Sequence, residues 1–305
     1  MTHYLPDYYF RGTNYTNYCK AMHQTATKNS RFVDYDYWEN QLEKIQKEYQ
    51  QESPFPYIKL DHFLKEDTAT AIHDSFPKVG EKGWIHYVHY NEKKHGLNKL
   101  EHFSPVISEA IQELNSDRFV KWLTALTGIE GLKADSMLEG GGLHQTLKGG
   151  FLNVHADFTV HPHKRNWRRR VNLIVYFNPE WEEQYGGALE LWDRKMTQCE
   201  ISIPPLFNRC VIFNTDEDSF HGYPEPISCP EDTSRKSIAL YYFTEEKVAP
   251  KKRTTNYQAR PDDGGKAFLI WLDKTVLAVY SRVKSTLGIN DDFVSKVLAF
   301  FSKKK

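Results

Sequence analysis

The sequence predicts a mainly β fold with flanking helices: a double-stranded β-helix, or jelly roll, packed by helices from both ends of the chain. Short β-type runs separated by glycine and proline follow Gly131, at residues 151–158, 169–177, 188–192, 200–203, 209–214 and 236–244. Many short strands with turn residues between them are typical of barrels and jelly rolls. The segments on either side repeat apolar residues every three or four positions instead, which predicts helices outside the sheet.

The composition argues against several classes of protein. Among 305 residues, Lys and Arg number 40 and Asp and Glu number 40, so the net charge is zero and no nucleic-acid partner is expected. No apolar run approaches the ~20 residues that cross a bilayer, so we expect no transmembrane segment. The four cysteines form no C-x-x-C pair, and the first residues lack the apolar core of a signal peptide, which predicts a cytoplasmic protein.

The N-terminal part begins with a polar stretch, residues 1–33, for which we expect irregular structure. Apolar residues then recur with helical spacing over residues 35–49. Three aromatic side chains of this predicted helix are expected to pack on the core: Tyr35, Trp38 and Tyr49. A short strand is predicted at residues 57–61, followed by a helix that ends at Pro77.

Two further helices are predicted before the β-rich region. Ser104 is a favourable N-cap residue, and the proline that follows it suits the first helical position. Ser116 caps the next helix, and Gly128 ends it because glycine readily adopts the left-handed conformation of a helix C-terminus.

The C-terminal tail returns to helical spacing from Lys266 to Gly288, after a polar stretch at residues 245–265. A last helix is predicted from Asn290, with acidic residues at its start and lysines at its end, as the helix dipole favours.

We therefore divide the chain into three parts: an N-terminal irregular segment and helix (1–53), a jelly-roll domain (54–246), and a linker with a C-terminal helical extension (247–305). The apolar positions of the extension predict packing on the barrel or assembly into a homo-oligomer, since so many would otherwise be left in water. Contact with an anionic membrane surface is the alternative.

The residues that point to chemistry begin with His155 and Asp157, on the strand predicted at 151–158. Side chains alternate along a strand, so these two lie on one face and can chelate one metal ion. We seek the third ligand at His221, which follows the apolar run at 210–214. Two histidines and one carboxylate that leave other positions open form the facial triad of non-haem Fe(II) oxygenases.

A cation is predicted beside this metal. Arg235 and Ser237 open the last predicted strand and share one face because they are two residues apart. A guanidinium group binds a carboxylate through two parallel hydrogen bonds, so Arg235 suits a dicarboxylate cosubstrate. Ser237 could add a hydrogen bond to the same carboxylate.

Residues 161–170 (HPHKRNWRRR) allow several interpretations. His161 and His163 could be metal ligands, although we expect them in a polar connection outside the strands. The basic residues either meet an anionic substrate near the mouth of the site or form a solvated loop, and the sequence leaves both open. Tyr185 and Trp192, which flank a Gly-Gly turn, are expected to be structural.

Several stretches resemble the Fe(II)/2-oxoglutarate-dependent oxygenases, in the branch around the prolyl 4-hydroxylase catalytic domain. The resemblance covers residues 55–245 approximately. It rests on segments 54–64 (PFPYIKLDHFL), 149–157 (GGFLNVHAD), 171–178 (VNLIVYFN), 186–192 (GGALELW), 208–214 (NRCVIFN), 221–222 (HG) and 235–244 (RKSIALYYFT).

This resemblance implies that His155, Asp157 and His221 hold Fe(II), while Arg235 pairs with the far carboxylate of 2-oxoglutarate. It implies that O2 and 2-oxoglutarate are consumed, that succinate is formed and that an unactivated C–H bond is hydroxylated, with ascorbate as a candidate reductant. Two amides, Gln145 and Asn153, are candidates to face the keto acid; the alternative for each is a buried amide with its own partners. Asn172 and Thr215 have no predicted role.

The resemblance defines the substrate poorly: a prolyl or other peptidyl residue, a free amino acid, or another small molecule. Desaturation or ring closure by the same iron chemistry is an alternative reaction. Halogenation is disfavoured because Asp157 is present, and related halogenases replace that carboxylate. A non-enzymatic jelly-roll binding module is an alternative of another class, but such a module needs no iron ligands.

Overall fold

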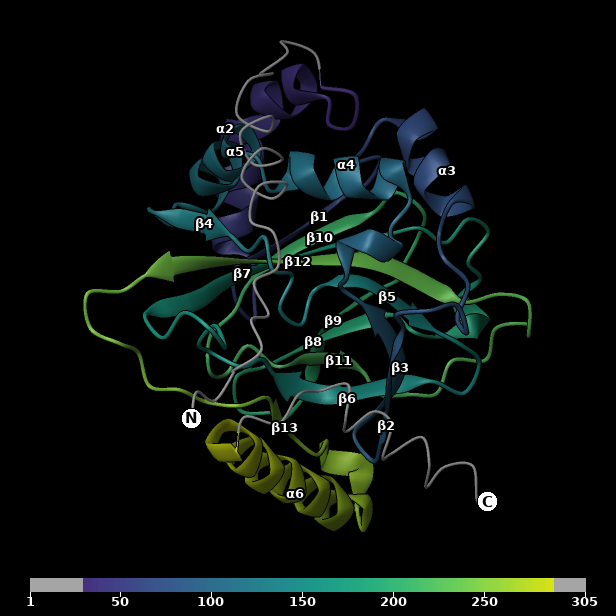
Figure 1. The fold of residues 1–305 in the computed structure, drawn as a ribbon, viewed down its shortest axis with the longest axis vertical. Coiled ribbons are helices and arrows are strands. Elements are labelled where there is room, and N and C mark those ends of the chain that lie inside the picture. Colours follow the sequence, from purple (N-terminus) through teal and green to yellow (C-terminus); the bar gives the residue numbers. More distant parts are fainter. Residues whose placement is uncertain (1–29, 288–305) are drawn as a thin grey trace, which may run out of the picture.

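The computed structural model describes residues 30–287, with side chains described as far as Val276; the last helix predicted from Asn290 and most of the N-terminal segment lie outside these residues. In the described range thirteen strands form one sheet, which curls into a half barrel (Figure 1). Its main path runs through β1 (Tyr57–Leu60), β10 (Cys210–Asn214), β7 (Trp167–Tyr176), β12 (Arg235–Glu245), β5 (Gly142–Thr146), β3 (Glu92–Leu97), β6 (Phe151–Ala156), β11 (His221–Tyr223), β8 (Leu189–Trp192) and β9 (Cys199–Ile203).

Three more strands pair off this path: β13 (Asn256–Tyr257) with β6, β2 (Ile85–His89) with β3, and β4 (Leu132–Ala134) with β12. Apart from β2 with β3 and β8 with β9, paired strands are not consecutive in sequence, and the named pairings are antiparallel. The predicted mainly β jelly-roll core with flanking helices is confirmed, and each of the six predicted core strands is present. The prediction did not include β2, β3, β4, β5, β11 or β13, and of these β3, β5 and β11 carry residues of the candidate site.

Helices α2 (Tyr35–Gln51), α3 (Glu66–Asp74), α4 (Pro105–Leu114) and α5 (Asp117–Thr127) cover one side of the curled sheet (Figure 1). The predicted N-caps are confirmed, because Ser104 accepts a hydrogen bond from Ile107 N and Ser116 accepts one from Phe119 N. Gly128 ends α5 with φ 70°, as its position predicted. The aromatic residues expected on the core are buried, and Tyr49 is fully so.

The helix predicted from Lys266 is α6 (Lys266–Leu287), and it lies at the opposite end of the sheet from α2 (Figure 1). It follows β13, so part of the stretch expected to be a linker is paired with the sheet. Ile270 of α6 is buried, whereas several large apolar side chains of the helix are exposed: Phe268, Leu269, Trp271, Leu272 and Val276. Among the described residues, no helix combines the length and the apolar character that crossing a membrane requires.

Candidate metal centre and cosubstrate site

The pairing of β6 with β11 brings the three predicted ligands together. His155 lies opposite His221 in the register of the two strands, and Asp157 directly follows β6. One potential ligand atom from each residue lies within 4.8 Å of the others. In the described part of the chain this is the one group of three or more His, Cys, Asp or Glu residues that could hold a metal ion.

Backbone carbonyl groups orient both imidazole rings. His155 Nδ1 lies 2.9 Å from Asn153 O, and His221 Nδ1 lies 2.9 Å from Ser219 O. A carbonyl oxygen only accepts, so each Nδ1 carries the proton and donates. Each Nε2 is thereby left as the basic nitrogen, and both face Asp157, at 3.6 Å and 3.4 Å. This is the tautomer that a metal-binding histidine needs.

The Asp157 carboxylate is held through one of its two oxygens. Oδ2 accepts hydrogen bonds from Asn172 Nδ2 at 2.8 Å and from Arg169 Nη2 at 3.0 Å. Oδ1 faces His155 and is available to a metal. Arg169 also donates to Asn172 Oδ1, and its guanidinium group stacks on Tyr241 at 3.4 Å, so it is fixed on several sides.

Both protonation states suit metal binding. Burial alone would raise the pKa of Asp157, but Arg169 outweighs it and holds this pKa well below its usual range. Burial lowers the pKa of His221 to about 4, so this imidazole is neutral at pH 7. An anionic carboxylate and neutral imidazoles are the forms that coordinate Fe(II).

Arg235 is a buried cation without a carboxylate partner among the described residues. It is 4% exposed, donates from Nε to Gly187 O at 2.7 Å and from Nη2 to Tyr176 Oη at 3.2 Å, and lies 4.1 Å from the ring of Tyr223. A side chain on Gly187 would crowd Ile227 at 2.7 Å, which explains the second glycine of the Gly-Gly turn. Leaving a charge buried without a counter-ion is costly, so this environment favours an anionic ligand.

The sheet register places Ser237 on the same face as Arg235. Ser237 is buried and lies opposite Tyr176 on β7 and His144 on β5. His144 was not predicted as a site residue: its Nε2 has no hydrogen-bond partner among the described residues, and burial lowers its pKa to about 3. Lys94 of β3 shares this face by alternation and pairs with Glu92 at 3.2 Å.

Neither predicted amide faces Arg235. Gln145 pairs with Lys236 in the sheet, and thus points to the opposite face from Arg235 and Ser237, where its Nε2 donates to Ser234 Oγ at 2.7 Å. Asn153 instead donates to Asn91 Oδ1 at 3.0 Å, in the turn between β2 and β3. Its carbonyl group is the part that touches the metal centre, through His155.

Residues 161–170 divide between a structural role and a site role. His161 is buried, lies 3.2 Å from Asp135 Oδ1 and accepts hydrogen bonds from two backbone N–H groups, so it braces a turn. Arg168 is half exposed and pairs with Asp216, but Arg169 turns inward to Asp157. Sequence reasoning missed Arg169 and Asn172, although alternation along the strand after the metal ligands would place both on one face if a bulge were allowed for.

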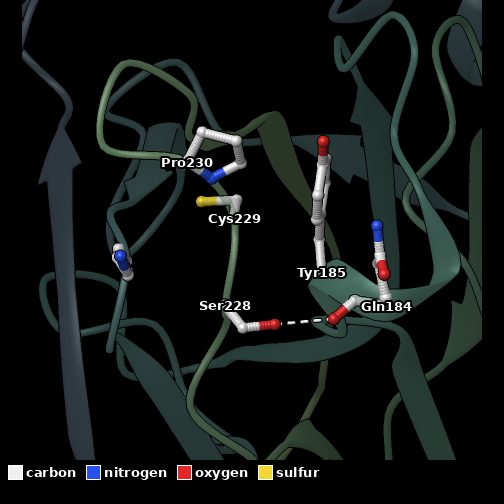
Figure 2. Close-up of a pocket in the computed structure, with 6 residues that line it drawn as sticks. Gln184, Tyr185, Ser228, Cys229 and Pro230 are labelled. Carbon is white, nitrogen blue, oxygen red and sulfur yellow. Dashed lines mark hydrogen bonds between the residues drawn. The ribbon is translucent and has the colours of Figure 1, made fainter.

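A separate cavity of about 260 Å³ lies at the surface (Figure 2). It is lined by Lys148, Gln184, Tyr185, Ser228, Cys229 and Pro230. None of the predicted site residues lines it, and Ser228 Oγ donates to Gln184 O across its floor.

Three comparisons place this geometry among known proteins. Residues 141–243 match the 2OG-Fe(II) oxygenase superfamily. The mouse protein "Prolyl 3-hydroxylase OGFOD1" is 34% identical over 203 residues, which are 62% of this chain and 33% of the mouse protein. The chain thus spans about a third of the length of that relative.

Solved structures that are similar to this chain include a prolyl-4-hydroxylase of Pseudomonas putida, with a TM-score of 0.48 and 15% identity over 66% of this chain and 99% of that chain. Another is a prolyl hydroxylase of Trichoplax adhaerens in complex with a hypoxia inducible factor oxygen degradation domain peptide, with a TM-score of 0.47 and 21% identity over 67% of this chain and 92% of that chain.

The matched region 141–243 contains the cluster of His155, Asp157 and His221, which could hold a metal ion, and the buried Arg235. This segment of the chain is similar to the 2OG-Fe(II) oxygenase superfamily, and the 203 residues shared with the mouse protein agree with that similarity.

Proposed function

We propose that the chain is an Fe(II)- and 2-oxoglutarate-dependent dioxygenase that hydroxylates an unactivated C–H bond. The observation that carries the proposal is that the His155, Asp157 and His221 cluster lies on the same face of the sheet as Arg235, which is buried and has no carboxylate partner among the described residues. A binding module of the same fold has no need of this combination.

The three clustered side chains would hold Fe(II) through His155 Nε2, His221 Nε2 and Asp157 Oδ1. Arg235 would pair with the far carboxylate of 2-oxoglutarate, and Ser237 would add a hydrogen bond to it. The bound iron, with 2-oxoglutarate and O2, supplies the oxidising chemistry; succinate and CO2 are the products of the cosubstrate. The buried site keeps water away from the reacting atoms.

Other residues of the protein orient the side chains that would bind the metal. Asn172 and Arg169 keep the Asp157 carboxylate in one rotamer, and the carbonyl groups of Asn153 and Ser219 keep both imidazole rings in one tautomer. His144 is neutral and has an unpartnered Nε2 on the face of Arg235, so it is a candidate to contact the keto acid or the substrate.

For the substrate we propose a prolyl or other peptidyl residue. The mouse relative is named a prolyl 3-hydroxylase, which supports this class for the region that the two chains share. A free amino acid or another small molecule, and desaturation or ring closure in place of hydroxylation, are the alternatives. From the sequence we also propose that the protein is cytoplasmic and that ascorbate serves as a reductant.

The deciding experiment measures succinate formed from 2-oxoglutarate by the purified chain with Fe(II), ascorbate and a panel of proline-containing peptides and free amino acids. We expect substrate-stimulated succinate and a product heavier by one oxygen atom. Loss of two hydrogen atoms would indicate desaturation or ring closure. Absence of succinate under every condition, with iron bound, would favour the binding module.

A further inference from the structure

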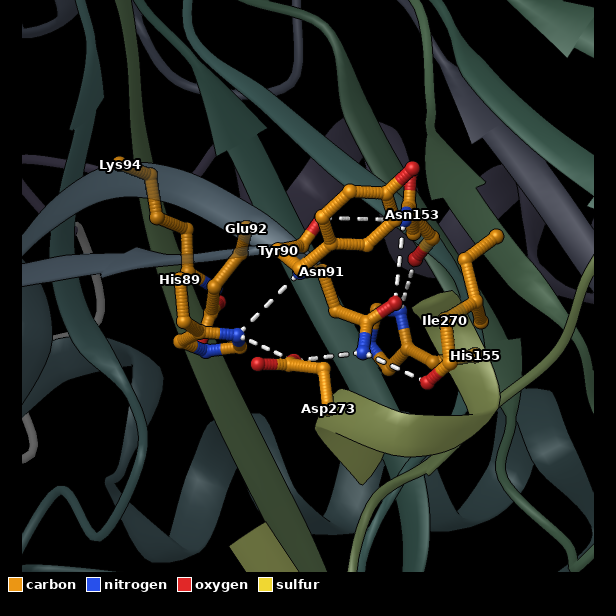
Figure 3. Close-up of polar contacts among 9 residues, drawn as sticks. All are labelled: His89, Tyr90, Asn91, Glu92, Lys94, Asn153, His155, Ile270 and Asp273. Carbon is orange, nitrogen blue, oxygen red and sulfur yellow. Dashed lines mark hydrogen bonds and ion pairs between the residues drawn. The ribbon is translucent and has the colours of Figure 1, made fainter. Parts of the chain in front are cut away.

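Three hydrogen bonds, which pass through Asn91 and Asn153, connect helix α6 to the ring of His155. Asp273 of α6 accepts from Asn91 Nδ2 at 2.7 Å, and Asn91 Oδ1 accepts from Asn153 Nδ2 at 3.0 Å. The carbonyl group of Asn153 then accepts from His155 Nδ1 at 2.9 Å. Figure 3 shows these side chains turned toward one another at the junction of α6 with the turn between β2 and β3.

Asn91 is the centre of this arrangement. It is fully buried, and its second Nδ2 hydrogen is donated to Ile270 O of α6 at 3.2 Å. Its backbone carbonyl group accepts from Asn153 N at 2.8 Å. Two of the contacts of Asn91 therefore depend on α6, and two reach the strand that carries His155.

Asn91 contacts β6 at a point where the ladder of hydrogen bonds between β6 and β11 is interrupted. The register between β6 and β11 shifts between the pairs His221↔His155 and Tyr223↔Leu152, so Asn153 lies in a bulge. A residue in a bulge has no ladder partner to fix its carbonyl group. Asn91 supplies that fixation, and it is itself oriented by Asp273.

The segment before α6 pairs with β6 as well, on the edge opposite β11. Tyr257 of β13 pairs with His155, their rings lie 5.5 Å apart, and Gln258 N donates to Val154 O. Residues 256–273 lie beyond the region 141–243 that matches the superfamily, so this support is not part of the matched domain.

We infer that α6 is a positioning element of the metal centre: Asp273, through Asn91 and the Asn153 carbonyl group, fixes the orientation of the His155 ring. The inference rests on the proposed function, because it takes His155 as a metal ligand. Partners that orient a ligand histidine are worth about 10- to 100-fold in metal affinity. Because Asp273 acts from two hydrogen bonds further away, we expect the lower end of that range.

The test measures Mn(II) affinity of the full chain without 2-oxoglutarate, by the electron paramagnetic resonance signal of free Mn(II). We expect Asp273→Ala and Asn91→Ala each to weaken binding by about tenfold. Asp273→Asn keeps an oxygen that can accept from Asn91 and should retain most of the affinity. Asp262→Ala is the matched control, since Asp262 is exposed just before α6, and it should bind as the wild type does.

Melting temperatures of the metal-free variants separate positioning from packing. A purely structural role would lower the melting temperature of Asp273→Ala and leave its Mn(II) affinity unchanged, and that result overturns the inference. Equal losses in Asp273→Asn and Asp273→Ala would overturn the hydrogen-bond route. If the wild-type chain binds no Mn(II), the proposed function fails first and the inference with it.

Discussion

Two buried arginines, Arg169 and Arg235, lie on the same face of the sheet, but only one of them has a carboxylate partner among the described residues. Arg169 has a carboxylate partner in Asp157, so its charge is balanced within the protein. Arg235 has only neutral partners among the described residues, a carbonyl oxygen, a hydroxyl group and two aromatic rings. The charge of Arg169 is therefore balanced within the folded protein, whereas we propose that a bound ligand balances the charge of Arg235.

Arg235→Ala should weaken the binding of 2-oxoglutarate much more than the binding of the metal. The loss removes a charge-assisted contact worth about 1.5–3 kcal/mol, which corresponds to roughly a 10- to 150-fold rise in KM for 2-oxoglutarate. Lysine at this position should recover part of it, since it restores the charge without the planar fork. An unchanged KM in the alanine variant would mean that another cation, such as Lys94, binds the cosubstrate.

Arg169→Met should destabilise the fold itself. Removing one partner of a buried ion pair leaves Asp157 uncompensated and costs about 3–5 kcal/mol. The neighbour Arg168 is the control, because its ion pair with Asp216 is exposed and Arg168→Met should cost under about 1 kcal/mol. Urea unfolding of the metal-free proteins measures both, and equal losses would contradict the assignment of Arg169 as the buried partner.

His221→Ala should abolish metal binding without unfolding the chain. The ring is one of three clustered ligands, and its removal leaves two, too few for a stable Fe(II) site. His163→Ala is the comparison from the H-P-H motif: His163 is exposed and pairs with Glu139, so this variant should bind Mn(II) normally. Full Mn(II) occupancy in His221→Ala would remove His221 from the site.

Single residues also mark how far the sequence leads. Strand alternation could predict that His155 shares a face with Asp157 and that Arg235 shares a face with Ser237, because the two residues of each pair are two positions apart. Arg169 resembled the exposed basic residues beside it, and only the fold shows that it turns inward. Gln145 was predicted to face the keto acid but lies on the opposite face of the sheet from Arg235. A shift of one position along β5 is enough to change the face on which a side chain lies.

At the scale of elements, sequence reasoning missed β3 because its residues are mostly polar. β3 reads Glu-Lys-Lys-His-Gly-Leu, a composition that strands generally avoid. It is a strand because it lies between β5 and β6, where its neighbours satisfy its backbone. Its inward Glu92 and Lys94 pair with each other, so the polar pattern reflects the lining of a site.

The junction of α6 with β2 contains a histidine between two carboxylates. His89 lies 2.9 Å from Glu92 and 2.9 Å from Asp273. Burial opposes the charged form of His89, but the two carboxylates outweigh it and raise its pKa. A raised pKa in the folded state means that the charged histidine stabilises the fold below its unfolded pKa of about 6.5, and that this stabilisation is lost as pH rises through the folded pKa.

His89→Gln should therefore lower the melting temperature most in mild acid. The gap between wild type and variant should narrow as the pH is raised from about 6 to about 9, because the wild type loses its imidazolium while glutamine does not titrate. Differential scanning calorimetry across this range measures the gap. A gap that stays constant or widens with pH would show that the charge on His89 does not contribute.

At the scale of the whole molecule, one side of α6 packs against the sheet and the other side is exposed. Ile270 and Asp273 contact the sheet, whereas Phe268 and Trp271 are 62% and 55% exposed and their rings stack on each other. The sequence predicted a C-terminal extension that packs or self-associates, and the exposed apolar residues support assembly with a second copy. Exposed apolar patches on a protein surface often mark an interface with another molecule.

Replacing Phe268 and Trp271 together by serine tests this assembly while leaving Ile270 and Asp273 in place. We expect the wild type to show a larger mass in solution than the double variant by light scattering at the same concentration, with Mn(II) affinity alike in both. Truncation after residue 262 should differ, because it removes Asp273 as well: the mass should fall and the metal should bind more weakly. If wild type and double variant are both monomers but only the wild type sediments with anionic vesicles, the exposed side of α6 faces a membrane surface and no interface between copies exists there.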